Sequence, residues 1–138
     1  MSPPPKRVLV LGAETEFGRA CAEALAAADC RLTLVSSKPD AEAAFAVQRL
    51  ARKLGASARA IDATNEAAVR VMLRQVSKDL GGLDATVVCV ADPAIASHAE
   101  RLARREMARS GGGVFVAATG DHGPADIVAA VAAPPANG

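Results

Sequence analysis

Aromatic residues are almost absent from this sequence of 138 residues, which holds three Phe, no Trp and no Tyr. Hydrophobic residues nevertheless make up 51% of the chain, and alanine is the most frequent of them. A chain of this length can bury a sizeable core. The core must therefore be aliphatic, and its small residues would let helices lie close to a sheet.

Cysteines and long apolar runs are also scarce, and the positive and negative charges nearly balance. Cys21, Cys30 and Cys89 are too few and too scattered for a disulfide framework, which indicates a reducing compartment and a cytoplasmic protein. The net charge of +1 comes without a basic block, so nucleic acid binding is not indicated. No apolar run approaches the roughly 20 residues of a membrane span, and the N-terminal residues lack the layout of a signal peptide.

Apolar segments alternate with helical patterns along the chain, which is typical of parallel α/β sheets. The predicted strands are Arg7–Leu11, Arg31–Val35, Ser57–Ile61, Asp84–Val90 and Val114–Ala118. Between them, apolar residues recur at helical spacing. The alternation therefore predicts an α/β fold in which helices cover a parallel sheet of about five strands.

Capping residues predict where helices begin and end. Ser37 is expected to cap the second helix, and Gly55 is a natural residue to end it. Asp92 followed by Pro93 predicts the start of a helix over Ala94–Arg109.

One domain is expected over residues 6–133, with a last short helix at Ala125–Ala133. The segments 1–5 and 134–138 are rich in proline and small residues, and we expect them to be disordered tails. We expect no metal site.

The segment after the first predicted strand reads Gly12-Ala13-Glu14-Thr15-Glu16-Phe17-Gly18. Dinucleotide-binding folds place glycines here, because the tight turn and the approach of pyrophosphate leave no room for a Cβ. The segment resembles the turn of the short-chain dehydrogenase/reductase family, with Gly12 and Gly18 as its outer glycines and Phe17 in the place of an isoleucine. By this resemblance Gly12, Thr15, Phe17 and Gly18 would contact a cofactor.

Later segments extend the resemblance. Ile61-Asp62-Ala63-Thr64 resembles the family's acidic motif after strand three, whose aspartate borders the adenine. Asp62 and Ala63 are therefore expected at the cofactor site, together with Ala91 at the end of strand four. The segments 82–88 and 110–119 resemble the approaches to the family's fourth and fifth strands. The resemblance implies a Rossmann-like, doubly wound parallel sheet of about five strands in the order 3-2-1-4-5, with helices on both faces.

The chain departs from the family where the family's chemistry is carried out. Cys89-Val90-Ala91-Asp92 stands in the place of an asparagine–alanine–glycine motif, and the insertion that carries a catalytic asparagine is shortened. The catalytic serine aligns with Ala118 or Thr119. The family's Tyr-x-x-x-Lys pair is absent, because the chain has no tyrosine and its last lysine is Lys78.

These departures predict a truncated, degenerate member of the family without catalytic residues. General acid–base catalysis of the missing kind contributes about 10²–10⁴-fold to a rate. His122, after strand five, is the best candidate to replace the missing proton donor. A loop histidine beside an aspartate such as Asp121, however, more often only helps to form a turn. His98 is expected to be a surface or helix-packing residue.

Nucleotide binding is opposed by one set of residues and favoured by another. Ser36, Ser37 and Lys38 would suit the 2′-phosphate of NADP, although an ordinary capped loop explains them equally well. Glu14 and Glu16 flank the phosphate position, and a carboxylate about 4 Å from a phosphate costs about 4 kcal/mol at an effective dielectric constant near 20. We expect Glu16 to act as an internal anion at the helix N-terminus. We therefore expect no bound cofactor, and NADP if any.

Three functions follow from the sequence. The favoured one is a non-catalytic domain with weak or vestigial dinucleotide binding that associates with itself or with a related dehydrogenase-like chain. In the family, the helices after strands three and four contact partner subunits, here Asn65–Leu80 and Ala94–Arg109, and strand five would lie near a sheet edge. The alternatives are a nucleotide-sensing regulatory module, and an NADP-dependent oxidoreductase with atypical catalytic residues or completed by a partner chain.

Overall fold

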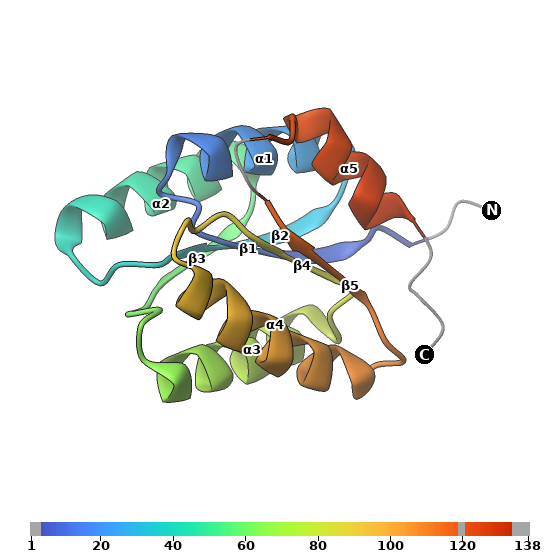
Figure 1. Cartoon of the computed structure of the whole chain (residues 1–138). Coiled ribbons are helices and arrows are strands. Elements are labelled where there is room, and N and C mark those ends of the chain that lie inside the picture. Colours follow the sequence, from blue (N-terminus) through green and yellow to red (C-terminus); the bar gives the residue numbers. More distant parts are fainter. Residues whose placement is uncertain (1–3, 119–120, 134–138) are drawn as a thin grey trace.

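A computed structural model describes residues 4–118 and 121–133 (Figure 1). The strands are β1 (Arg7–Leu11), β2 (Arg31–Ser36), β3 (Ser57–Ala60), β4 (Ala85–Val88) and β5 (Val114–Ala117), and the helices are α1 (Glu16–Ala27), α2 (Ala41–Leu54), α3 (Glu66–Leu80), α4 (Pro93–Ala108) and α5 (Pro124–Ala132). All strands are parallel, in the order β3-β2-β1-β4-β5. The predicted Rossmann-like fold is confirmed. The predicted tails lie outside the described residues except for Pro4 and Pro5.

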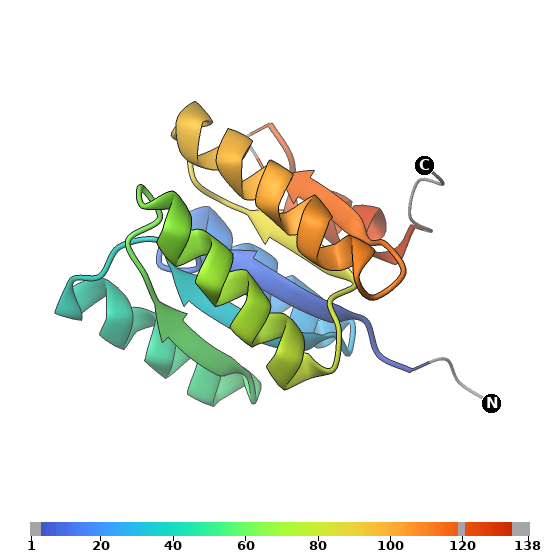
Figure 2. The same ribbon diagram turned by 90° about the horizontal axis from the view of Figure 1, so that it is seen from below.

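Two helical layers cover the sheet. Helices α1, α2 and α5 lie on one face, and α3 and α4 lie side by side on the other (Figures 1 and 2). Side chains of β1 alternate between these layers: Val8 and Val10 pack with the first group of helices, and Leu9 and Leu11 with the second. All four are at most 1% exposed, and burial of each contributes about 1.5–3 kcal/mol. In the described part of the chain, no helix combines the length and the apolar character that a membrane span requires.

Three strands are shorter than predicted, and their ends explain why. Strand β4 begins at Ala85 instead of Asp84, because the Asp84 carboxylate accepts hydrogen bonds from Arg7. After β4, Cys89 still donates to Leu11 O at 2.8 Å, but the chain then leaves the sheet. Strands β3 and β5 each end one residue early, with a single last hydrogen bond from Ile61 or Ala118.

Helix ends were predicted well where the capping contact is local. Asp92 caps α4 with Pro93 as its first residue, and Gly55 ends α2 in the left-handed conformation with φ +70°. The prediction that Ser37 caps α2 is wrong. Asp40 caps it, accepting from Ala43 N at 3.1 Å, because Ser37 is bound to a distant residue of the turn after β1. Helices α4 and α5 each begin and end one residue before the predicted ranges.

Two glycines allow α1 to begin directly against the sheet. Gly12 has φ +92°, and a Cβ on it would lie 2.9 Å from the carbonyl oxygen of Cys89 at the end of β4. A Cβ on Gly18 would lie 2.1 Å from the carbonyl oxygen of Gly12. Thr15, between them, accepts a hydrogen bond from Gly18 N at 2.9 Å and so caps the helix. The turn therefore closes on itself, and both glycines are needed for its packing.

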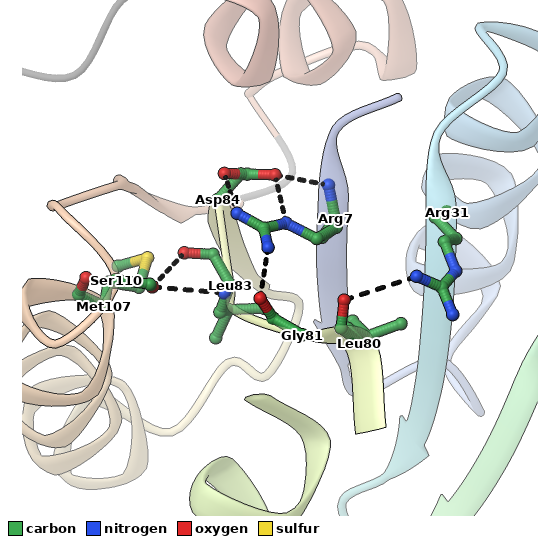
Figure 3. A network of polar contacts seen from close by, with 8 residues as sticks. All are labelled: Arg7, Arg31, Leu80, Gly81, Leu83, Asp84, Met107 and Ser110. Atoms are coloured by element: carbon green, nitrogen blue, oxygen red, sulfur yellow. Dashed lines mark hydrogen bonds and ion pairs between the residues drawn. The ribbon is translucent and has the colours of Figure 1, made fainter. Parts of the chain in front are cut away.

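An ion pair joins β1 and β4 at their amino ends, at the side of the sheet opposite the glycine turn (Figure 3). The Arg7 backbone N donates to the Asp84 carboxylate at 2.8 Å, and Nε and Nη2 of its guanidinium donate at 2.9 Å each. Arg7 Nη1 donates to Gly81 O, and Arg31 Nη1 donates to Leu80 O at 3.3 Å. The hydrogen bonds from Arg7 lower the pKa of Asp84 despite its partial burial. The pair thus fixes the start of β1 to the turn between α3 and β4.

Replacement of Asp84 by Asn should lower the free energy of unfolding by about 1–2 kcal/mol at pH 7, because a charged, partly buried acceptor is lost. Since the folded-state pKa of Asp84 lies below its unfolded value, its contribution is present above about pH 4 and is lost as the pH falls through the folded pKa. Urea unfolding at pH 7 and at about pH 3 should therefore show a difference between wild type and Asp84→Asn that shrinks in acid.

The control for this prediction is Asp79→Asn, which breaks the more exposed pair between Arg59 and Asp79. Its effect should stay below about 0.5 kcal/mol. An equal loss in both variants would contradict a special role for the pair between Arg7 and Asp84.

Replacement of Gly18 by Ala should lower the free energy of unfolding by more than about 3 kcal/mol, because backbone must move to admit the Cβ. Gly55→Ala is the matched control. A Cβ at Gly55 meets no atom within 4 Å, so only the positive φ is unfavourable and the loss should be about 1 kcal/mol. Thermal or urea unfolding measures both, and equal losses would show that the turn is not closely packed.

Candidate functional site

The carboxyl ends of the strands form the edge at which open α/β sheets bind ligands. Every predicted cofactor-binding residue lies at this edge: Gly12, Thr15, Phe17 and Gly18 at the start of α1, Ser36, Ser37 and Lys38 at the end of β2, Asp62 and Ala63 after β3, and Ala91 after β4. The structure therefore brings the predicted residues to one edge of the sheet. Their binding of a cofactor stays a prediction.

The turn after β1 uses many of its own polar groups. The hydroxyl of Thr15 donates to Gly12 O at 2.8 Å and accepts from Gly18 N at 2.9 Å. The amides of Gly12 and Ala13 both donate to Val35 O, at 2.9 and 3.2 Å. One of the helix-terminal amides that could bind phosphate is thus already satisfied by Thr15.

Glu16 does not act as the predicted internal anion. It is the first residue of α1, it is exposed, and its side chain makes no hydrogen bond with any residue in the described ranges. The Thr15 side chain caps the helix instead, because a hydroxyl at the N-cap position reaches the amide of Gly18. The hypothesis for Glu16 is therefore wrong.

Glu14 makes the internal contact that the sequence did not predict. Ser37 N donates to Glu14 Oε1 at 3.0 Å, and the Ser37 hydroxyl donates to Glu14 Oε2. Ser37 is only 8% exposed, and Glu14 is half-buried. The carboxylate thus connects the turn after β1 to the end of β2. The adjacency of β1 and β2 in the predicted strand order was the signal that could have indicated this contact.

The hydroxyl of Ser36 is also used within the chain. It donates to Lys38 O at 2.7 Å and accepts from Lys38 N at 3.2 Å, and Ser36 is 0% exposed. Both hydroxyls that were expected to bind a 2′-phosphate therefore already have protein partners. Among these three predicted residues, only Lys38 is exposed at this end of β2.

The segment after β3 forms a local turn and a contact with α4. Asp62 Oδ1 accepts from the hydroxyl and the amide of Thr64, at 2.6 and 3.1 Å, and these hydrogen bonds lower the pKa of Asp62. Ala63 N donates to Ser37 O at 3.1 Å, and the Ala63 carbonyl oxygen lies 2.9 Å from His98 Nε2. His98 is therefore a helix-packing residue, as one of its two predicted roles had it.

An apolar cavity of about 570 Å³ lies at the ends of β4 and β5 beside the start of α1. It is lined by Thr15, Phe17, Val88, Cys89, Val90, Ala91, Pro93, Ala96, Ala117 and Ala118. Among these lining residues, only Thr15 and Cys89 carry a polar side chain. The hydroxyl of Thr15 is bonded to Gly12 O, as described above.

The thiol of Cys89 is poorly suited to nucleophilic chemistry. It lies beside the thiol of Cys21 on α1, and this neighbour together with burial raises the pKa of Cys89. Cys21 and Cys89 are 0% and 6% exposed, so both thiols are buried. A protonated, buried thiol is a weak nucleophile and a weak acid.

The position of the family's catalytic serine is apolar where it is described. Ala118, one of its two aligned residues, is 8% exposed and lines the cavity, whereas Thr119 lies outside the described residues. His122 is exposed in the segment before α5. The described residues contain no group of three or more metal-ligating side chains.

Comparison with known proteins identifies the family. Residues 12–109 match the family model described as enoyl-(acyl carrier protein) reductase. No curated protein matches the chain.

Solved structures support the same assignment. A short-chain type dehydrogenase/reductase from Mycobacterium ulcerans is 26% identical over 83% of this chain and 51% of that chain, with a TM-score of 0.68. One from Mycobacterium marinum is 25% identical over 80% and 53%, with a TM-score of 0.65. The NADPH-dependent 3-quinuclidinone reductase from Rhodotorula rubra, 21% identical over 80% and 50%, has the same fold, with a TM-score of 0.62.

The chain spans about half the length of these solved structures. Its match to the family model covers well over half of its own residues. Its fold, its glycine turn and its acidic segment after β3 occur in the order that the family has. The chain therefore belongs to the short-chain dehydrogenase/reductase family, whose enoyl-(acyl carrier protein) reductase model it matches.

Proposed function

We propose that the chain is a non-catalytic short-chain-dehydrogenase-like domain that keeps weak, vestigial dinucleotide binding and acts by associating with itself or with a related dehydrogenase-like chain. The observation that carries this proposal is the lining of the 570 Å³ cavity. Reduction of a carbonyl by hydride transfer requires a positioned proton donor, and general acid–base catalysis of this kind contributes about 10²–10⁴-fold. The two polar side chains in the lining, Thr15 and Cys89, are engaged with other groups of the chain.

The turn after β1 fits a dinucleotide by its backbone but not by its charge. Gly12 and Gly18 keep the close approach of strand, turn and helix that pyrophosphate binding uses. Glu14 and Glu16, however, place two carboxylates in the turn, and like charges oppose a bound pyrophosphate. Weak binding follows from this combination, and the NADP preference predicted from Ser36, Ser37 and Lys38 stays a prediction.

Association through the edge of β5 is supported by the exposure of that strand. β5 is bonded to β4 alone and lies at the edge of the sheet (Figure 1). Val114, Phe115 and Val116 are only half-buried. Since Val114 N and Ala118 N donate to β4, the amides of Phe115 and Ala117 face the free edge. Such an edge is a template for another strand.

The same edge favours one alternative function, an oxidoreductase that a second chain completes. A partner strand beside β5 would lie next to the apolar cavity, because Ala117 lines it. The three free cysteines support the proposal of a reducing, cytoplasmic compartment.

The isolated chain should not turn over a carbonyl substrate. We expect NADH and NADPH oxidation across a panel of aldehydes, ketones and enoyl thioesters to stay at the rate without protein, because the two proton-bearing side chains among the described lining residues, Thr15 and Cys89, are engaged within the chain. Loss of absorbance at 340 nm measures this rate. Steady turnover by the chain alone, at about 1 s⁻¹ or faster, would contradict the proposal, whereas turnover only after a related full-length chain is added would support the alternative.

Replacement of Ala117 by Pro should weaken self-association at least about tenfold in Kd, because it removes an edge amide without removing a hydrogen bond to β4. Ala60→Pro is the matched control on the opposite edge, since Ile61 N donates to β2 and the amide of Ala60 faces outward. Light scattering at several concentrations measures the mass of each variant, and circular dichroism verifies its fold. A monomeric wild type, or equal loss in both variants, would contradict association through β5.

A further inference from the structure

The end of β2 is where a Rossmann-like fold distinguishes the two forms of an adenosine ribose. An acidic residue there accepts hydrogen bonds from an unphosphorylated ribose, and a cation there accommodates a 2′-phosphate. This chain has no acidic residue at Ser36, Ser37 or Lys38. Sequence position alone therefore predicts that the site takes a phosphate.

The structure supplies the missing carboxylate from another loop. Glu14, in the turn after β1, is held at the end of β2 by hydrogen bonds from the amide and the hydroxyl of Ser37. The amide donor is part of a backbone segment fixed by Ala63 N, which donates to Ser37 O at 3.1 Å. A negative charge is thus fixed where an acidic residue after β2 would otherwise provide it.

The hydroxyl groups that would bind a phosphate are already hydrogen-bonded within the chain. The Ser37 hydroxyl is bonded to Glu14, and the Ser36 hydroxyl is bonded to the backbone of Lys38. A phosphate here would have to displace Glu14 or lie beside its carboxylate. The exposed side chain of Lys38 offers only a solvent-screened attraction. A ribose hydroxyl, in contrast, can donate to the remaining lone pairs of the carboxylate.

We infer that Glu14 is a specificity-determining residue that makes the chain bind an adenosine ligand with an unphosphorylated ribose in preference to its 2′-phosphate. This inference rests on the proposed dinucleotide binding and deepens it. It reverses the preference for NADP that the residues after β2 predict.

The test compares NAD with NADP, which differ only in the 2′-phosphate. Each is titrated into wild type and into Glu14→Gln, and amide chemical shifts or calorimetry give the dissociation constants. Wild type should bind NAD at least about tenfold more tightly than NADP, a difference of about 1.4 kcal/mol. Glu14→Gln keeps the size of the side chain and removes its charge. Its preference should fall to about threefold or less, mainly because NADP binds more tightly.

Glu16→Gln is the matched control. It removes the same charge two residues after Glu14, and the Glu16 side chain makes no hydrogen bond among the described residues. It can raise both affinities, because both ligands carry the pyrophosphate, but the ratio between them should stay within about twofold of wild type. Thermal unfolding of both variants verifies that they are folded.

Several results would overturn the inference. They are equal or tighter binding of NADP by wild type, an unchanged ratio in Glu14→Gln, and an equal change of the ratio in Glu16→Gln. Failure of both ligands to bind wild type and Glu14→Gln at millimolar concentration would overturn it together with the proposed dinucleotide binding. Binding with the wrong ratio would overturn the inference alone, and light scattering decides the proposed association independently of either.

Discussion

Close packing in the turn between β1 and α1 is the constraint on which the candidate site depends. The backbone of Gly12 lies against the end of β4, and Gly18 lies against the carbonyl oxygen of Gly12, so neither position admits a side chain. This packing sets where α1 begins and how near it lies to β1 and β4. It also directs the remaining turn residues, Glu14 among them, toward the end of β2. Changes in this turn therefore alter the binding edge and the core together.

Most of the polar side chains described above at the carboxyl ends of the strands are directed toward the protein itself. Thr15 caps its own helix, Ser36 bonds to the backbone of its own turn, and Ser37 bonds to Glu14, while the thiol of Cys89 lies beside that of Cys21. The described residues that line the cavity between β4, β5 and α1 are mostly apolar. The scaffold keeps the fold of the family, and these polar groups contribute to its stability. We propose that association has taken the place of turnover.

The fold was predictable because its signals are local and repeated. Apolar segments and helical spacing gave the five strands, the family resemblance gave their order, and Asp92 and Gly55 marked helix ends by contacts within a few residues. The site was predictable in position but not in contacts. Ser37 was assigned to a helix cap, because its partner Glu14 lies 23 residues away in sequence. The start of β4 was predicted one residue too early for the same reason, since Asp84 pairs with Arg7 across 77 residues.

The contact between Glu14 and Ser37 is the most direct point at which to test this account, and it needs no ligand. Native-state hydrogen exchange measured by NMR reports whether the amide of Ser37 is bonded in solution. The account predicts that this amide exchanges at least about tenfold more slowly in wild type than in Glu14→Ala, whereas Glu16→Ala leaves its rate unchanged. An amide of Ser37 that exchanges at the same rate in wild type and in Glu14→Ala would contradict it.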